Sequence, residues 1–421
     1  MCKKIIVCAL GLILAFSVSA QERKKFIDGQ MTDRFREHTG TVLDSRFLEQ
    51  DMYEVALDRE LAASYDTVCT YRVSHNQVTD QMKSGRCWLF STFNILRDEM
   101  IKKHDMGHFE FSQTYGMFWD ILEKSNRFLE NVIDNRKKPI DSRMNAWLFM
   151  KPIGDGGHFA NAAHIIDKYG VVPQEVMPER HSSLDNKWLM NLVRTSLRRY
   201  GLKLREADAK DIQSVKEKAL ADIYSILAHN LGLPPTEFEW TLKDKDGKVI
   251  STRSYTPYSF RDEFIWHDLE KDYVIFMNDS TKPYYRMYRV ENSRNCYEYA
   301  DWTFMNVPMD DILAMGVESL KNNTMFYFSA DTDASMLMMG GIYDVGLYDL
   351  GKDFGVSLDM TKEEKIRSCE IKSAHAIAMT GVQLGEDGEP VKGHVENSFG
   401  TVRGWDGYVV MQNEWLKTYL F

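Results

Sequence analysis

The segment QMKSGRCWLF, residues 81–90, places a cysteine at the start of an apolar helical pattern. Cys87 follows Ser84, Gly85 and Arg86, and apolar residues then recur at helical spacing up to Met100. The first turn of a helix carries unpaired N–H groups and the positive end of the helix dipole, which together stabilise a thiolate and lower its pKa. A lone cysteine is more often a small core residue, but this turn predicts a nucleophile.

Two neighbours of Cys87 extend this interpretation. Gln81 lies six residues before Cys87 and carries a side-chain amide. If the chain folds back over the start of the helix, this amide and the helix N–H groups can receive a developing oxyanion. Arg86 either stabilises the thiolate or is a solvated turn residue, and the sequence leaves both roles open.

His375 lies in the uncharged strand pattern SAHAIAMTGVQL, where an isolated histidine would be a hydrogen-bonded core residue. This strand leads into the turn GEDGEP, residues 385–390, and the returning segment VKGHVENSF carries Asn397. Mirror pairing about this turn sets Asn397 opposite residue 377 or 378, about 10 Å or less from His375 along the strand. An asparagine carbonyl that accepts the imidazole N–H would leave the other ring nitrogen facing the thiol, as a nucleophile, base and orienter require.

The rest of the chain divides by structural class and not by composition. From Cys87 to about residue 250 the pattern is mostly helical. Short runs rich in β-branched and aromatic residues follow at 273–277, 325–328, 374–383 and 408–411. We therefore predict an α+β fold, with a helical half over about 67–250, a strand-rich half over about 251–421, and a cleft where the halves meet.

The N-terminus has the pattern of a secretory signal peptide. It runs from MCKK through an apolar stretch shorter than a membrane span to the small residues Ser19 and Ala20. We predict cleavage after Ala20, export to the periplasm or the exterior, and no stable membrane anchor. Loss of Lys3 and Lys4 takes the net charge from -10 to -12, and no basic cluster is dense enough to follow a phosphate backbone, so nucleic acid is not an expected partner.

Cysteine and histidine usage argues against other chemistries. The four cysteines that remain after residue 20 are widely and irregularly spaced, unlike a disulfide scaffold. His104 and His108 have the spacing of metal ligands on a helix, but no glutamate lies between them and Gly107 disfavours a continuing helix. We therefore predict neither a metal site nor a cofactor.

The motifs QMKSGRCW, SAHAIAMTGV and HVENSFG together resemble those of the papain-like cysteine peptidases, in the branch of bleomycin hydrolase and aminopeptidase C. The resemblance covers nearly all of the chain after residue 20. It implies the two-lobed papain fold with helical insertions and hydrolysis of peptide substrates, with Cys87 as nucleophile, His375 as base and then acid, Asn397 as orienter and Gln81 as oxyanion donor.

The resemblance also suggests a substrate-binding loop. Gly156 and Gly157, in DGGHF, match a loop on the cleft wall of the family. Without side chains they would let a substrate backbone approach closely enough to hydrogen-bond. An ordinary tight turn is the alternative.

Three departures separate this sequence from the family pattern. Phe399 stands where papain-like enzymes usually have a tryptophan that shields the contact between asparagine and histidine. Members of this branch are usually intracellular, whereas this chain is predicted to be exported. In the branch a C-terminal arm lies in the cleft and restricts cleavage to N-terminal residues, whereas this sequence ends at Phe421. Aminopeptidase specificity and a ring of six copies are therefore expectations from the resemblance alone.

Three alternative functions remain. An open cleft would make the protein an endopeptidase, and a non-catalytic peptide-binding protein would keep the fold without the activity. A transglutaminase-like acyl transferase would use the same nucleophile and base with an amine acceptor, although the motif around Cys87 argues against it.

Overall fold

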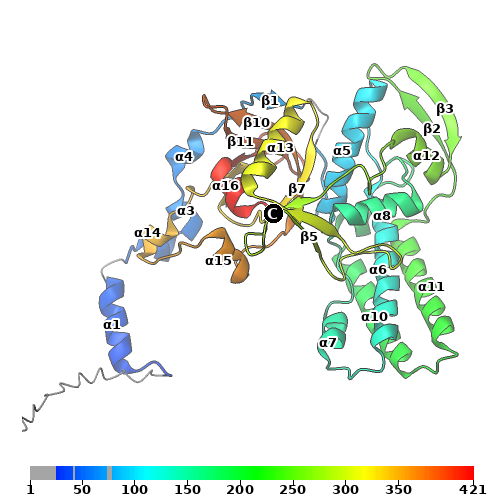
Figure 1. Ribbon diagram of the computed structural model, residues 1–421, viewed down its shortest axis with the longest axis horizontal. Helices are drawn as coiled ribbons and strands as arrows, with labels where there is room; N and C mark the ends of the chain where they lie inside the picture. Colours follow the sequence, from blue (N-terminus) through cyan, green and yellow to red (C-terminus); the bar gives the residue numbers. More distant parts are fainter. Residues whose placement is uncertain (1–24, 41–42, 74–77) are drawn as a thin grey trace, which may run out of the picture. The chain divides into compact units, whose positions relative to one another are not determined.

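The computed structural model describes residues 25–40, 43–73 and 78–421 (Figure 1). The predicted signal peptide, residues 1–20, lies outside the described residues. The chain divides into two compact units, one formed by residues 1–55 with 350–357 and the other by residues 56–349 with 358–421. All of the predicted site residues lie in the second unit.

The described part of the first unit is helical. It contains α1 (Gly29–Gly40), α2 (Arg46–Glu49), most of α3 (Met52–Ala56) and α14 (Leu350–Phe354). The rings of Phe47 and Phe354 lie 4.6 Å apart and join α2 to α14. None of the helices of this unit contains a fully buried side chain among the described residues.

The helices of the second unit fall mainly between residues 87 and 231. They are α4 (Arg59–Ala63), α5 (Cys87–His104), α6 (Gln113–Asn135), α7 (Arg143–Met150), α8 (Phe159–Tyr169), α9 (His181–Leu184), α10 (Lys187–Glu206), α11 (Ile212–Leu231), α12 (Pro257–Phe264), α13 (Met309–Lys321), α15 (Lys362–Arg367) and α16 (Asn413–Tyr419).

Most strands follow residue 238. They are β1 (Tyr71–Arg72), β2 (Phe238–Lys243), β3 (Val249–Tyr255), β4 (Phe276–Met277), β5 (Arg286–Arg289), β6 (Thr303–Asn306), β7 (Phe326–Ala330), β8 (Met336–Leu337), β9 (Ile342–Tyr343), β10 (His375–Leu384), β11 (Pro390–Glu396) and β12 (Tyr408–Gln412). The largest sheet has seven strands in the order β1-β10-β11-β12-β9-β8, with β7 also paired to β10, while β2-β3 and β4-β6-β5 form smaller sheets.

Two hydrophobic cores organise the second unit. In one, α6, α10 and α11 pack as a bundle around buried apolar side chains such as Phe128, Leu197 and Leu227, and the three helices run side by side in Figure 1. In the other, α5 packs against β10 and α8. Because α5 is buried along most of its length, its first residue is held between the large sheet and the helices.

The structure confirms the predicted hairpin. Strands β10 and β11 pair antiparallel with Ala378 opposite Glu396, so Asn397 follows directly after the last paired residue, close to the predicted register. Of the predicted segment 273–277 only Phe276–Met277 is a strand. Strand β1 was not predicted, because two residues carry no periodicity. Over the described ranges, no helix is both long enough and apolar enough to cross a membrane.

Candidate active site

Cys87 is the first residue of α5 and is buried, with an exposed fraction of 8%. Burial raises the pKa of its thiol, but a hydrogen bond to His375 and the charge of that histidine act in the opposite direction and outweigh the effect of burial. The backbone N–H groups of Ala376 and Trp88 also donate toward the sulfur. The net pKa lies below the ordinary thiol value, as expected for a cysteine at a helix start beside a histidine.

His375 shows the complementary shift. Burial lowers the pKa of the imidazole, but the hydrogen bond and charge of Cys87, together with a hydrogen bond to Asn397, raise it above its ordinary value. A lowered thiol pKa beside a raised imidazole pKa favours the thiolate and imidazolium pair. This is the charge state that a nucleophilic cysteine requires.

Asn397 orients the imidazole. The Nε2 atom of His375 lies 2.9 Å from Asn397 Oδ1, so Nδ1 is the ring nitrogen left for the thiol. The ring of Phe399 stacks on His375, with centroids 5.0 Å apart and planes 21° apart. A phenyl ring therefore covers the face of the histidine at this position. The Arg403 guanidinium in turn lies over the Phe399 ring, 4.8 Å from the ring centroid.

Gln81 is fixed beside the start of α5. Its Nε2 atom donates to the Ser84 carbonyl at 2.6 Å, and its Oε1 atom accepts from the Ser398 hydroxyl at 2.6 Å. The backbone N–H of Gln81 also donates to the Ser398 carbonyl at 2.9 Å. A primary amide has two N–H bonds, so one remains for an oxyanion. Ser398 was not predicted, since only the paired fold brings it to Gln81.

The surroundings of Arg86 differ from both roles that the sequence left open, a stabiliser of the thiolate and a solvated turn residue. Its side chain is buried, and its guanidinium forms a paired contact with the Glu179 carboxylate at 2.8 and 2.9 Å. It also donates to the Ser183 carbonyl at 2.8 Å and to the Ser84 hydroxyl at 2.9 Å. Arg86 is therefore neither a solvated turn residue nor a partner of the thiolate. It anchors the turn before Cys87 to Glu179, just before α9, and to Ser183 within α9.

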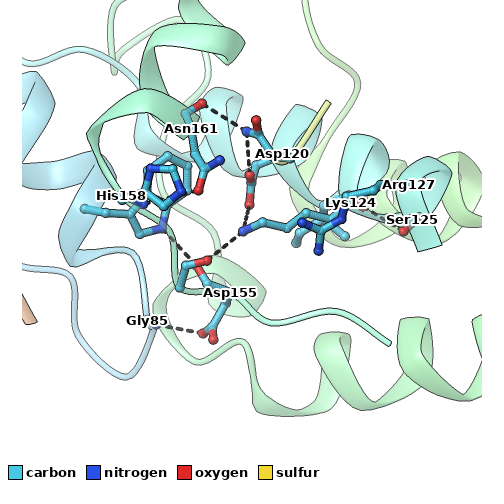
Figure 2. Close-up of polar contacts among 12 residues, drawn as sticks. Gly85, Asp120, Lys124, Ser125, Arg127, Asp155, His158 and Asn161 are labelled. Atoms are coloured by element: carbon cyan, nitrogen blue, oxygen red, sulfur yellow. Dashed lines mark hydrogen bonds and ion pairs between the residues drawn. The ribbon is translucent and has the colours of Figure 1, made fainter. Parts of the chain in front are cut away.

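A second anchor of this turn is Asp155, which the sequence analysis did not single out. Figure 2 shows its carboxylate beside Gly85, whose N–H donates to Asp155 Oδ2 at 2.7 Å. The Asn186 amide donates to the same oxygen at 2.8 Å, and the Asp155 carbonyl accepts from Trp88 Nε1 at 3.0 Å. Burial raises the pKa of the Asp155 carboxyl, but the hydrogen bonds from Asn186 and Gly85 lower it and outweigh the effect of burial. The carboxylate is therefore charged.

The two glycines after Asp155 differ in their surroundings. A Cβ atom on Gly157 would lie 2.8 Å from the Trp88 ring, so this position has no room for a side chain. A Cβ atom on Gly156 would meet no atom within 4 Å. Gly157 is thus packed against the residue that follows Cys87, while Gly156 borders open space, as a loop on a cleft wall would.

Buried polar contacts also join α5 to the hairpin. The Ser91 hydroxyl donates to the Ala376 carbonyl at 2.9 Å, next to His375. Asn94 and Arg97 donate to Glu396 Oε1 at 2.9 and 3.1 Å. Glu396 directly precedes Asn397, so the helix that carries the nucleophile is tied to the strand that carries the orienter.

Comparison with known proteins agrees with this geometry. The model of the Peptidase C1-like family matches residues 22–421. The chain belongs to this family. Its α+β papain-like fold is confirmed by the crystal structure of PepW from Lactobacillus rhamnosis HN001, which is 32% identical, has a TM-score of 0.90, and is matched over 94% of this chain and 91% of that one.

Sequence relatives of this Peptidase C1-like protein support the predicted branch. It is 34% identical to aminopeptidase C of Listeria monocytogenes over 85% of this chain and 82% of the relative. It is 31% identical to aminopeptidase E of Lactobacillus helveticus over 97% and 93% of the two chains. The aminopeptidase C branch of the cysteine peptidases is therefore confirmed.

Proposed function

We propose that this protein removes N-terminal residues from peptides by hydrolysis, with an acyl-enzyme on Cys87. The observation that carries the proposal is the position of His375, which bonds both Cys87 and Asn397 while the thiol pKa is lowered and the imidazole pKa is raised. A metal ion is not needed for this chemistry, because the thiolate supplies the nucleophile.

The first half of the reaction is acylation. The Cys87 thiolate attacks the carbonyl carbon of the scissile bond, and a C–S bond forms as the carbonyl oxygen becomes an oxyanion. The N–H of Cys87 and the remaining N–H of Gln81 donate to this oxyanion. The His375 imidazolium then gives its proton to the leaving amine, the C–N bond breaks, and a thioester remains.

The second half releases the acyl group. His375, now neutral, takes a proton from water as the water oxygen attacks the thioester carbonyl. The C–S bond breaks, the N-terminal residue leaves as a carboxylic acid, and the resulting Cys87 thiolate again faces the imidazolium. Asn397 holds the ring in one orientation throughout, because Nε2 stays bonded to its side-chain oxygen.

The restriction to N-terminal residues is supported by the names of the relatives. We would incubate the purified protein with matched peptides in free-amine and N-acetylated forms and identify products by mass spectrometry. Cleavage of free-amine peptides alone, one residue at a time, is the expected result. Internal cleavage of acetylated peptides would instead indicate an endopeptidase, and transfer to an added amine would indicate an acyl transferase.

Two variants test the chemistry. Cys87→Ala should abolish cleavage while retaining the fold, and Cys369→Ala, which removes an exposed thiol, should leave cleavage unchanged. Activity that survives in Cys87→Ala would refute the mechanism. Absence of activity in the unmodified protein under reducing conditions would favour the non-catalytic peptide-binding alternative.

Location and assembly are part of the same proposal. The pattern of residues 1–20 supports export, so the substrates would be peptides of the periplasm or the exterior. Detection of the protein in the periplasmic fraction, with Gln21 as its N-terminal residue, would test this. A ring of six copies is proposed from the family resemblance, and analytical ultracentrifugation would measure it.

A further inference from the structure

An arginine adds a third layer to the stack beside His375. The Phe399 ring stacks on His375 with centroids 5.0 Å apart, and the Arg403 guanidinium carbon lies 4.8 Å from the Phe399 centroid. The guanidinium is therefore at most about 10 Å from the imidazole, a distance that an extended chain covers in about three residues. The stack thus brings a permanent positive charge close to the residue that protonates the leaving amine.

The backbone fixes the point from which the Arg403 side chain starts. The Arg403 carbonyl accepts from the Gly407 N–H at 3.0 Å, and the Gly404 N–H donates to the Met339 carbonyl at 3.1 Å. Gly404 has a φ of +61°, and a Cβ atom there would lie 2.1 Å from the Tyr408 carbonyl oxygen, so only glycine fits this position. Arg403 therefore precedes a tight turn that is bonded to a neighbouring loop.

The Arg403 guanidinium has no acceptor within residues 25–40, 43–73 and 78–421. Its side chain is half-buried, yet it makes no hydrogen bond and no ion pair in those ranges. By contrast, the Arg86 guanidinium uses its donors on Glu179 and Ser183. An arginine has five N–H donors in a planar fork that matches a carboxylate. The donors of Arg403 are therefore available to water or to an anionic group of a ligand.

A carboxylate lies in the same region but beyond ion-pair distance of Arg403. Asp333 comes three residues after Ala330, the residue of β7 that pairs with His375. Burial raises the pKa of Tyr343 to about 12, while the charge of Arg403 lowers it and the charge of Asp333 raises it. Both charges thus act on the surroundings of one tyrosine. An anion in this region is repelled by Asp333 and attracted by Arg403.

We infer that Arg403 is a specificity-determining residue that binds the C-terminal carboxylate of a short leaving peptide. This inference rests on the proposed function and deepens it. The leaving amine takes its proton from His375, so the leaving residues begin at the imidazole. The carbon of a carboxylate that is paired with a guanidinium lies about 4 Å from the guanidinium carbon. The remaining distance of about 6 Å or less is the span of one or two residues. The preferred substrates are therefore dipeptides and tripeptides with a free C-terminal carboxylate.

Matched peptides isolate this contact. Leucyl-glycyl-glycine and its C-terminal amide share the scissile bond and both leaving residues, and they differ in the charge of the group that meets Arg403. A longer pair, leucine followed by six glycines with a free or an amidated end, places that group beyond Arg403 in an extended chain. Release of leucine, followed by mass spectrometry, gives kcat/KM for each peptide. The ratio of the value for the acid to the value for the amide is the measurement.

Two variants complete the experiment. Arg403→Met removes the charge and the donors but keeps an unbranched side chain that can pack on Phe399. Arg72→Met is the matched control, because the Arg72 guanidinium also lies over an aromatic ring, 5.6 Å from the Tyr408 centroid, while Arg72 pairs with Gly381 and not with His375. Both peptides of a pair are measured on each protein, so a general loss of active enzyme cancels in the ratio. Thermal melting checks the fold.

The ratio for the tripeptide pair should be about five in the unmodified protein and in Arg72→Met, the upper range for an ion pair that water reaches. In Arg403→Met it should fall to about one, and about 1 M sodium chloride should lower it in the unmodified protein. The longer pair should give a ratio of about one in all three proteins.

A ratio of one for the tripeptide pair in the unmodified protein, or a ratio that Arg403→Met leaves unchanged, would overturn the inference and leave the proposed function intact. Failure of the unmodified protein to release leucine from any of the four peptides would instead refute the proposed function.

Discussion

Replacement of Asn397 by alanine removes the acceptor that orients the catalytic histidine. The bond from His375 Nε2 to Asn397 Oδ1 is 2.9 Å long, and both residues are buried. A hydrogen bond to a charged partner contributes roughly 1.5–3 kcal/mol. If this energy is lost from the transition state, the rate falls about 10- to 150-fold. Stacking on Phe399 keeps the ring partly held, so activity should fall without vanishing.

The assay is kcat and KM for a free-amine peptide substrate, measured with Asn397→Ala and the unmodified protein. We expect the loss in kcat, because Asn397 acts through the histidine and not through the substrate. Asn145→Ala is the matched control. Asn145 is also a buried asparagine, bonded to the Pro139 carbonyl at 2.8 Å in the turn before α7, and its replacement should lower stability but not kcat. A loss of less than threefold in Asn397→Ala would refute the orienting role.

Three further predictions concern the surroundings of the thiol. Arg86→Ala should lower the free energy of unfolding by about 3 kcal/mol in urea, since it leaves the Glu179 carboxylate without its buried partner; a loss under about 1 kcal/mol would contradict this. Phe399→Ala should lower kcat about tenfold by admitting water to the histidine, whereas Phe399→Trp should keep kcat; equal kcat values for the two variants would count against shielding. Alkylation of Cys87 by iodoacetamide should stay fast as the pH falls below about 8.5, because its pKa is lowered. In His375→Ala the rate of alkylation should instead drop about tenfold per pH unit. Mass spectrometry of the alkylated protein measures both rates, and the same pH dependence in the two proteins would exclude the pair of Cys87 thiolate and His375 imidazolium.

The predictions that succeeded depend on short stretches of chain. The start of α5 at Cys87 follows from helical periodicity after a turn, and the hairpin follows from two strand patterns about a glycine-containing turn. Both are local signals. The hairpin alone brings Asn397 within reach of His375, so this half of the site needed little knowledge of the tertiary fold.

The environment of Arg86 illustrates what local signals miss. An arginine in a turn is usually solvated, and its partner Glu179 lies far along the sequence. Burial of the turn against the segment before α9 makes the ion pair, and nothing in the residues around Arg86 indicates this. Asp120 and Lys124 on α6 show the same limit. Their i, i+4 spacing is a visible signal for an ion pair, but their burial and the hydrogen bond from Lys124 Nζ to the Gly156 carbonyl are not.

The sequence by itself determined which residue types carry the chemistry and how the local elements form around them. Cys87 begins a helix, and His375 and Asn397 share one hairpin, because helical and strand periodicities are properties of neighbouring residues. The tertiary structure decided how these elements meet. Only packing of α5 against β10 brings the thiol to the imidazole and shifts both pKa values. The reason is physical: burial, charge proximity and hydrogen-bond geometry depend on groups distant in the chain, and these groups have no fixed separation until it folds.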